Sequence, residues 1–258
     1  MPIILLSNDD GIDAEGLQAL IPGLSELGEL WVVAPDSERS AAGRAVSLNR
    51  PLRVQERAPR RFAVDGTPAD CVLLATRHFL PARPDLLVSG INGGYNIGED
   101  LDYSGTVAAA AEGALQGARA SMAVSRKAGS SPDVLRHAVE VTLHLARLLL
   151  VEGLPKGSYL NVNVPVEPSW RLRFTRQGNP LPPGEIEQRI DPRGQPYYWI
   201  ANRPTEENPP PDTDRGALRE ACISVGLLTL DRDHPGPWQK PSLDGTPLIL
   251  TPAKGLDA

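Results

Sequence analysis

The stretch LLSNDDGIDAEG, residues 5–16, decides the fold and raises the first functional question. The apolar run at 3–7, IILLS, predicts a buried strand, and two adjacent aspartates and a glycine follow closely after it. Successive side chains of a regular strand point to opposite faces of the sheet, so Asp9 and Asp10 can converge only where the strand unwinds into a loop. Open α/β sheets keep their ligand sites at such strand ends, so this stretch predicts an α/β fold with a site near residues 9–11.

Strand and helix signals alternate outward from this stretch. We expect a helix over 14–28, broken or bent near Pro22, then a strand at 30–35, and later a helix capped by Thr67 with Pro68 at its first position. The remaining expected elements are a strand at 85–90, a helix at 105–117, a short strand SMAVS, a helix at 132–151 and a strand at 159–165. This alternation predicts a Rossmann-like three-layer αβα fold, with a mainly parallel sheet covered on both faces.

The composition changes after about residue 166, which divides the chain into three parts. Residues 1–166 are the expected α/β core. Residues 167–215 contain many Pro, Arg and Gln residues, and the aromatic stretch QPYYWIA follows a turn signal, RGQP, so we expect an extended hairpin or arm. Residues 216–258 hold a return strand, ACISVGLLTL at 221–230, and an irregular tail.

Charge and composition exclude several classes of protein. Asp and Glu outnumber Lys and Arg by 32 to 26, and no basic block is present, so a nucleic-acid partner is disfavoured. No window approaches the roughly 20 apolar residues of a membrane span, and the first residues carry no charged leader, so we expect a cytoplasmic protein without a membrane partner. Cys71 and Cys222 are far apart and outside any CxxC motif, so both are expected to be packing residues.

The aspartate pair is the first candidate site. Two carboxylates at a strand end can neutralise a hard divalent cation such as Mg²⁺ or Mn²⁺ and leave positions for water and substrate, while Gly11 lets the backbone turn. The alternative is a turn with an aspartate helix cap. A second loop, APDSERSAAGRAVSL at 34–48, offers Ser40 as a hydroxyl ligand or phosphate donor, although a solvated surface loop is the simpler reading of it.

The stretch SGINGGYNIGEDLDYSGT, residues 89–106, is the most unusual in the chain. Its glycines let the backbone approach a small ligand, and the carboxamide oxygens of Asn92 and Asn96 can coordinate a metal without adding charge. A flexible loop is the alternative. At its end, Ser104 and Thr106 stand where a helix begins, so their hydroxyls and the first N–H groups of the helix predict an anion site, or simply a helix cap.

These segments together resemble one family. LLSNDDGIDAEGLQAL, VVAPDSERSAAG, GTPADCV, DLLVSGINGGYNIGEDLDYSGTVAAAAEGAL and LNVNVP, in this order, are similar to the SurE family, the survival-protein-E nucleotidases, over roughly residues 1–230. The resemblance implies one divalent metal ion held by Asp9, Asp10, Ser40 and Asn92. It also implies phosphate contacts at Asn96, Ser104, Gly105 and Thr106. Two residues depart from the family pattern, Tyr95 where a proline is usual and Arg44 where a histidine or other polar residue is frequent, which puts substrate preference in question.

The resemblance implies hydrolysis of nucleoside 5′- and 3′-monophosphates by metal-assisted attack of water on phosphorus. We hypothesise that Asp9 also orients this water or accepts its proton, and a phosphoaspartyl intermediate stays open. Two other functions also stay open, a non-catalytic metal-dependent nucleotide-binding module and a Mn²⁺-dependent nucleotide-sugar glycosyltransferase. Members of the family form dimers that exchange an extension, so the resemblance implies a homodimer or homotetramer with Tyr197, Tyr198 and Trp199 at the subunit contact.

Overall fold

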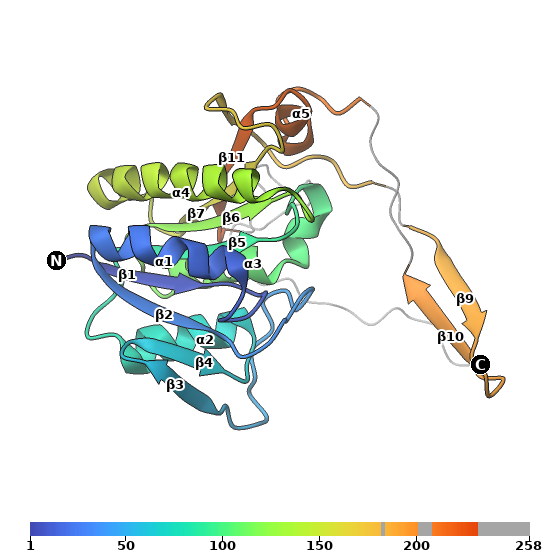
Figure 1. Ribbon diagram of the computed structural model, residues 1–258, viewed down its shortest axis with the longest axis horizontal. Helices are drawn as coiled ribbons and strands as arrows, with labels where there is room; N and C mark the ends of the chain where they lie inside the picture. The colour runs from blue at the N-terminus through green and yellow to red at the C-terminus, as the bar shows by residue number, and fades with distance from the viewer. Residues whose placement is uncertain (182–183, 201–207, 232–258) are drawn as a thin grey trace, which may run out of the picture.

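The computed structural model describes residues 1–181, 184–200 and 208–231. Within them, nine strands form one sheet (Figure 1) in the order β3 (Val54–Ala58), β4 (Arg61–Val64), β2 (Glu29–Pro35), β1 (Ile3–Ser7), β5 (Leu86–Asn92), β6 (Ser121–Arg126), β7 (Ser158–Val164), β11 (Ile223–Thr229) and β8 (Leu172–Phe174). Only the β3–β4 and β7–β11 pairs of this sheet are antiparallel. The mainly parallel sheet is therefore confirmed.

Helices cover both faces of the sheet, which makes the predicted three layers. The helices α1 (Glu15–Leu27) and α4 (Pro132–Glu152) lie together on one face, and α2 (Pro68–Leu74) and α3 (Gly105–Leu115) lie on the other (Figure 1). Successive side chains of β1 point to opposite faces of the sheet. Ile4 and Leu6 therefore pack in the core under α1 and α4, whereas Leu5 packs under α2 and α3. Three short helical segments complete the described elements: η1 (Ala75–Phe79), η2 (Gly98–Asp102) and α5 (Asp214–Arg219).

Local signals marked several element ends correctly. The Thr67 side chain accepts a hydrogen bond from the backbone N–H of Asp70, whose carboxylate accepts one from Thr67 N–H, so α2 begins with a capping box and Pro68 in its first turn. Both cysteines are buried and free, as expected.

Two expectations were wrong in detail. Helix α1 is not broken at Pro22, because Leu17, Leu20 and Leu24 form an apolar stripe that packs on the sheet on both sides of the proline. Strands β3 and β4 lie between residue 35 and Thr67, where no strand was expected. The residues of β3 are almost all exposed, so its sequence, VQERA, lacks the apolar alternation that identifies a strand.

The predicted arm is a separate two-stranded hairpin. Strands β9 (Ile186–Ile190) and β10 (Pro196–Ile200) pair antiparallel, and they stand away from the three layers (Figure 1). Every residue of both strands is exposed. The return strand β11 joins the main sheet beside β7. Residues 232–258 of the expected tail lie outside the described residues. No helix that the structure describes combines the length and the apolar character needed to cross a membrane.

Candidate metal and phosphate site

The aspartate pair lies at the point where the strand order of the sheet reverses. The chain runs from β1 to β2 on one side and later returns to β5 on the other side, so the loops diverge at the carboxyl end of β1, which is where open α/β sheets bind their ligands. Asp9 is 5% exposed and Asp10 is half-buried. Gly11 has a φ of +103° and lies against the backbone of Ser37, so the turn after the pair requires a glycine.

The first turn of α3 holds the Asp9 carboxylate. The Thr106 hydroxyl donates a hydrogen bond to Asp9 Oδ1, and the Thr106 backbone N–H also hydrogen-bonds this carboxylate. A Cβ at Gly105 would lie 2.8 Å from Asp9 Cβ, so only glycine allows the helix this close. The positive end of the α3 dipole therefore faces the carboxylate.

Asp10 has different neighbours. The backbone N–H of Gly93, in the loop after β5, donates to Asp10 Oδ2 at 3.2 Å. The charges of Glu38 and Arg126 act on Asp10 with opposite sign. Neither residue was predicted. Both follow or end strands at the same edge of the sheet, β2 and β6, and this position was the signal that could have identified them.

The electrostatics of the pair favour a bound cation. Burial raises the pKa of Asp9 to about 6, against the opposing hydrogen bond from Thr106, and the charge of Asp10 adds to the rise. Burial likewise raises the pKa of Asp10, although the Gly93 N–H opposes the rise. Two carboxylates, one buried and one half-buried, whose charged forms are disfavoured by burial suit a divalent cation, which would offset both charges. The described residues hold no cluster of three His, Cys, Asp or Glu side chains suited to a metal, so neutral oxygens must complete such a site.

The two predicted neutral ligands flank the pair. The Arg39 backbone N–H donates to the Asp9 carbonyl at 2.7 Å, which brings the loop after β2 against the end of β1. Ser40 is exposed on this loop, and its hydroxyl donates to Glu38 Oε1 at 2.7 Å. Asn92 ends β5, and its Nδ2 donates to the Gly94 carbonyl at 2.7 Å, which leaves its Oδ1 as the oxygen for a ligand.

The predicted phosphate contacts have partners within the protein. The Asn96 Nδ2 donates to Ser125 Oγ at 2.8 Å, and the Asn96 backbone is held by the side chains of Asn161 and Asn163 on β7. The Ser104 Oγ accepts from Val107 N–H at 3.1 Å as the cap of α3. Its own hydroxyl proton is left to donate. A role of these side chains toward phosphate stays a prediction.

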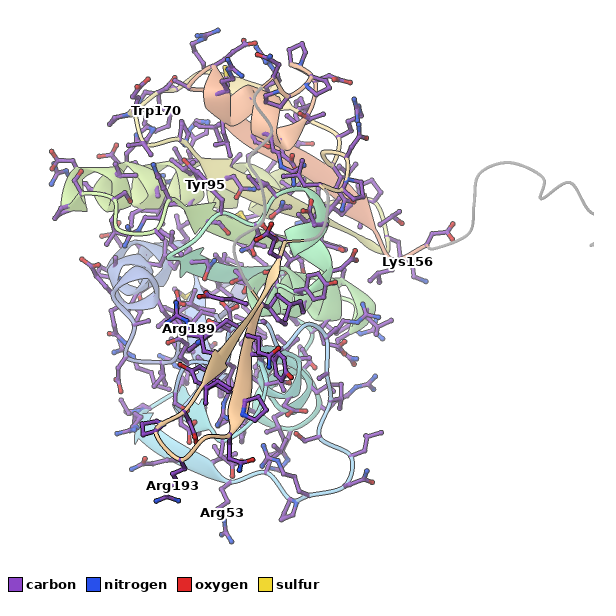
Figure 2. All side chains as sticks on the ribbon, turned by 90° about the vertical axis from the view of Figure 1, so that its right-hand side faces the viewer. Arg53, Tyr95, Lys156, Trp170, Arg189 and Arg193 are labelled. Carbon is purple, nitrogen blue, oxygen red and sulfur yellow. The ribbon has the colours of Figure 1, made fainter. Side chains whose placement is uncertain are left out.

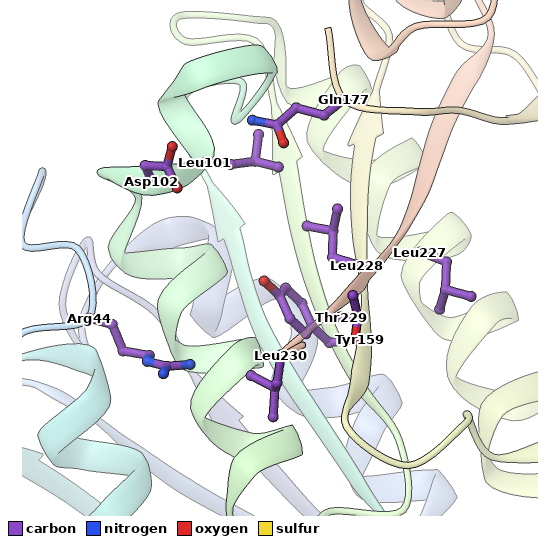
Figure 3. Close-up of a pocket in the computed structure, with 9 residues that line it drawn as sticks. All are labelled: Arg44, Leu101, Asp102, Tyr159, Gln177, Leu227, Leu228, Thr229 and Leu230. Atoms are coloured by element: carbon purple, nitrogen blue, oxygen red, sulfur yellow. The ribbon is translucent and has the colours of Figure 1, made fainter. Parts of the chain in front are cut away.

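Arg44 lies beside the buried carboxylate of Glu112. It lines a cavity of about 440 Å³ beside α3, together with Leu101 and Tyr159 (Figure 3). Its Nε lies 4.0 Å from the carboxylate of Glu112, which is buried on α3. The Glu112 carboxylate therefore offsets the charge of Arg44.

Comparison with known proteins identifies the family of this chain. The family model of the survival protein SurE matches residues 4–181. The 5′-nucleotidase SurE of Pelobacter propionicus is 47% identical over 234 residues, covering 88% of this chain and 93% of that protein. The 5′-nucleotidase SurE of an Anaeromyxobacter species is 49% identical, covering 90% and 91%. The crystal structure of the SurE protein from Aquifex aeolicus superposes with a TM-score of 0.77 at 39% identity, covering 90% of this chain and 95% of that one. The chain therefore belongs to the SurE family.

Proposed function

We propose that this chain is a divalent-metal-dependent nucleotidase, which hydrolyses nucleoside 5′-monophosphates and also 3′-monophosphates to nucleoside and phosphate. The observation that carries the proposal is the pair of the buried Asp9 and the half-buried Asp10 at the switch point of the sheet, without a cationic side chain to neutralise Asp9 among the described residues. Two relatives, which are 47% and 49% identical to this chain over the aligned residues, are named 5′-nucleotidases. That name supports neither a pure binding module nor a glycosyltransferase.

The proposed site holds one Mg²⁺ or Mn²⁺ per subunit on Asp9, Asp10, Ser40 and Asn92. When bound, the cation would polarise a phosphoryl oxygen and lower the pKa of water. Asp9 orients the attacking water or accepts its proton, because the Thr106 hydroxyl fixes the carboxylate in one orientation.

The phosphate lies at the start of α3 in this proposal. Ser104 donates its free hydroxyl proton to a phosphate oxygen, and the positive end of the helix dipole favours the charge of the phosphate. The Gly105 backbone and Asn96 complete the proposed contacts, the latter from a loop that β7 holds in place.

The test measures inorganic phosphate released from 5′-AMP and 3′-AMP in Mg²⁺, in Mn²⁺ and in EDTA. We expect release with metal, none in EDTA, and none in Asp10→Asn under any condition, because this change halves the carboxylate charge at the site. Asp13→Asn is the matched control, since Asp13 is an exposed aspartate three residues further along the same loop. Full activity in EDTA, or equal activity of Asp10→Asn and wild type, would contradict the proposal.

The hairpin supports a further part of the proposal, self-association to a dimer or tetramer. Tyr198 is 60% exposed and Trp199 is 58% exposed on β10, and the hairpin stands apart from the core (Figure 1). A two-stranded hairpin with exposed aromatic residues is marginal in water alone, so burial against another subunit would stabilise it.

A further inference from the structure

A small cavity lies at the carboxyl edge of the sheet, the edge that also carries the aspartate pair. Its volume is about 290 Å³, close to the lower end of ligand pockets. Tyr95, Lys127 and Pro165 line it, and these residues follow the ends of β5, β6 and β7, respectively. The end of α5 with Arg219 closes the other side. Figure 2 views the molecule onto this edge, with Tyr95 labelled.

The near side of the cavity, at Tyr95 and Lys127, lies closest to the aspartate pair, and the side formed by the residues after β7 and by the end of α5 lies further away. Strand β6 is two strands away from β1, and strand spacing places the two ends about 10 Å apart. The loop after β5 joins the two places, because Gly93 hydrogen-bonds Asp10 and Tyr95 follows two residues later. In a nucleoside 5′-monophosphate, one ribose separates the phosphorus from the base. When the phosphate of a nucleotide lies at the aspartate pair, its base can extend along this edge of the sheet. One of the two directions along the edge leads to the cavity.

Tyr95 presents a fixed aromatic ring to this cavity. The ring is half-buried, and the backbone of Val166 hydrogen-bonds its phenol oxygen. Burial raises the pKa of Tyr95 to about 12, so the phenol is neutral at physiological pH. A flat neutral ring is a stacking platform that accepts any nucleobase, because each base has a π-face.

Two exposed cations, Lys127 and Arg219, and one exposed carboxylate, that of Glu167, stand at the rim of the cavity. Within the described residues, neither Lys127 nor Arg219 lies within 4 Å of a carboxylate. Such side chains donate to the carbonyl oxygens and ring nitrogens of bases. The larger cavity of Figure 3 is a weaker candidate, because aliphatic residues from β11 line it and Glu112 offsets the charge of its Arg44.

We propose that this cavity is the nucleoside subsite of the enzyme, with the base stacked on Tyr95. The inference rests on the proposed nucleotidase function and adds to it a residue that selects nucleotides over other phosphate esters.

The test compares AMP with ribose 5-phosphate, which lacks a base, in the metal-saturated enzyme. In Tyr95→Ala we expect the KM for AMP to rise about tenfold, the effect of losing one stacked base, with kcat nearly unchanged. The KM for ribose 5-phosphate stays at its wild-type value. Tyr95→Phe keeps the ring and is expected to keep the wild-type KM for AMP. As a control, Tyr103→Ala removes an exposed aromatic residue between β5 and α3. We expect this change to affect the KM for AMP and the KM for ribose 5-phosphate equally.

Three outcomes overturn the subsite. Equal losses with both substrates in Tyr95→Ala indicate that the ring only supports the loop. Unchanged constants exclude any role, and a loss specific to AMP in Tyr103→Ala places the base elsewhere. If the wild type releases phosphate from neither substrate, the proposed nucleotidase function fails, and this result leaves the binding question to a separate measurement. Calorimetric binding of AMP and ribose 5-phosphate to the same variants then gives the comparison without turnover.

Discussion

Replacing the buried Asp9 carboxylate by an isosteric amide should stabilise the metal-free protein while it abolishes activity. Burial raises the pKa of Asp9 from 3.8 to about 6, with the Thr106 hydrogen bond opposing and the charge of Asp10 adding to the rise. The folded state therefore binds the proton of this group more tightly than the unfolded state does. A rise of this size corresponds to about 3 kcal/mol of lost folding free energy at any pH above 6.

The sign of the effect sets its pH dependence. Below about pH 3.8 the group is protonated in both states and costs nothing, and the cost develops as the pH rises from there to about 6. Asp9→Asn is never charged, and its amide oxygen still accepts from the Thr106 hydroxyl. We expect Asp9→Asn to be more stable than the wild type in EDTA at pH 7.5, by about 1–3 kcal/mol.

Thermal unfolding followed by circular dichroism measures this difference. For a protein of this length, each kcal/mol corresponds to about 2–4 °C in Tm. The gain should shrink at pH 4, and Mg²⁺ or Mn²⁺ should raise the Tm of the wild type at pH 7.5 but have little effect on Asp9→Asn. The exposed Asp13 provides the control Asp13→Asn, with no gain expected. An Asp9→Asn protein that is less stable than the wild type in EDTA at pH 7.5 would refute the reasoning, as would a gain that is the same at both pH values.

Three further changes address the rest of the site and the arm. Ser40→Ala and Asn92→Ala each remove one neutral oxygen, so the metal concentration needed for half-maximal activity should rise by about tenfold, and activity should recover in excess metal. The control Ser37→Ala should leave this concentration unchanged. An unchanged metal requirement in both variants would show that these ligands are wrongly assigned. Thr106→Val removes the hydroxyl that stabilises the charged Asp9, so kcat should fall by about tenfold or more and the acidic limb of the pH profile should move to higher pH. Thr106→Ser keeps the hydroxyl and should keep the wild-type kcat and pH profile. An acidic limb that does not move in Thr106→Val would contradict the role of this bond. Replacing Tyr197, Tyr198 and Trp199 of β10 by serine should shift the mass measured by light scattering toward that of the monomer. An unchanged oligomer with normal activity would refute the role of the arm.

Sequence alone predicted the features that depend on neighbouring residues. The cap of α2 needs only Thr67, Pro68 and Asp70, which lie within four positions, and the structure has the capping box that such a spacing favours. The strand β1 reads as an apolar run because helices cover both of its faces. Strand β3 escaped prediction because its residues face solvent, so no burial shapes its sequence.

The contacts inside the site could not be read from the sequence, because they join residues far apart in the chain. The hydroxyl of Thr106, a predicted phosphate contact, also donates to Asp9, which is 97 positions away in the chain, and the sequence did not predict this bond. Glu38 acts on Asp10 from the loop after another strand. Sequence shows that these loops meet at one edge of the sheet, but which side chains meet depends on the packing of α3 against β1. That packing depends in turn on Gly105, where any side chain would collide with Asp9. The glycine of the SGT sequence therefore has a reason independent of phosphate: it lets the helix that carries Thr106 reach the carboxylate that the proposed reaction uses.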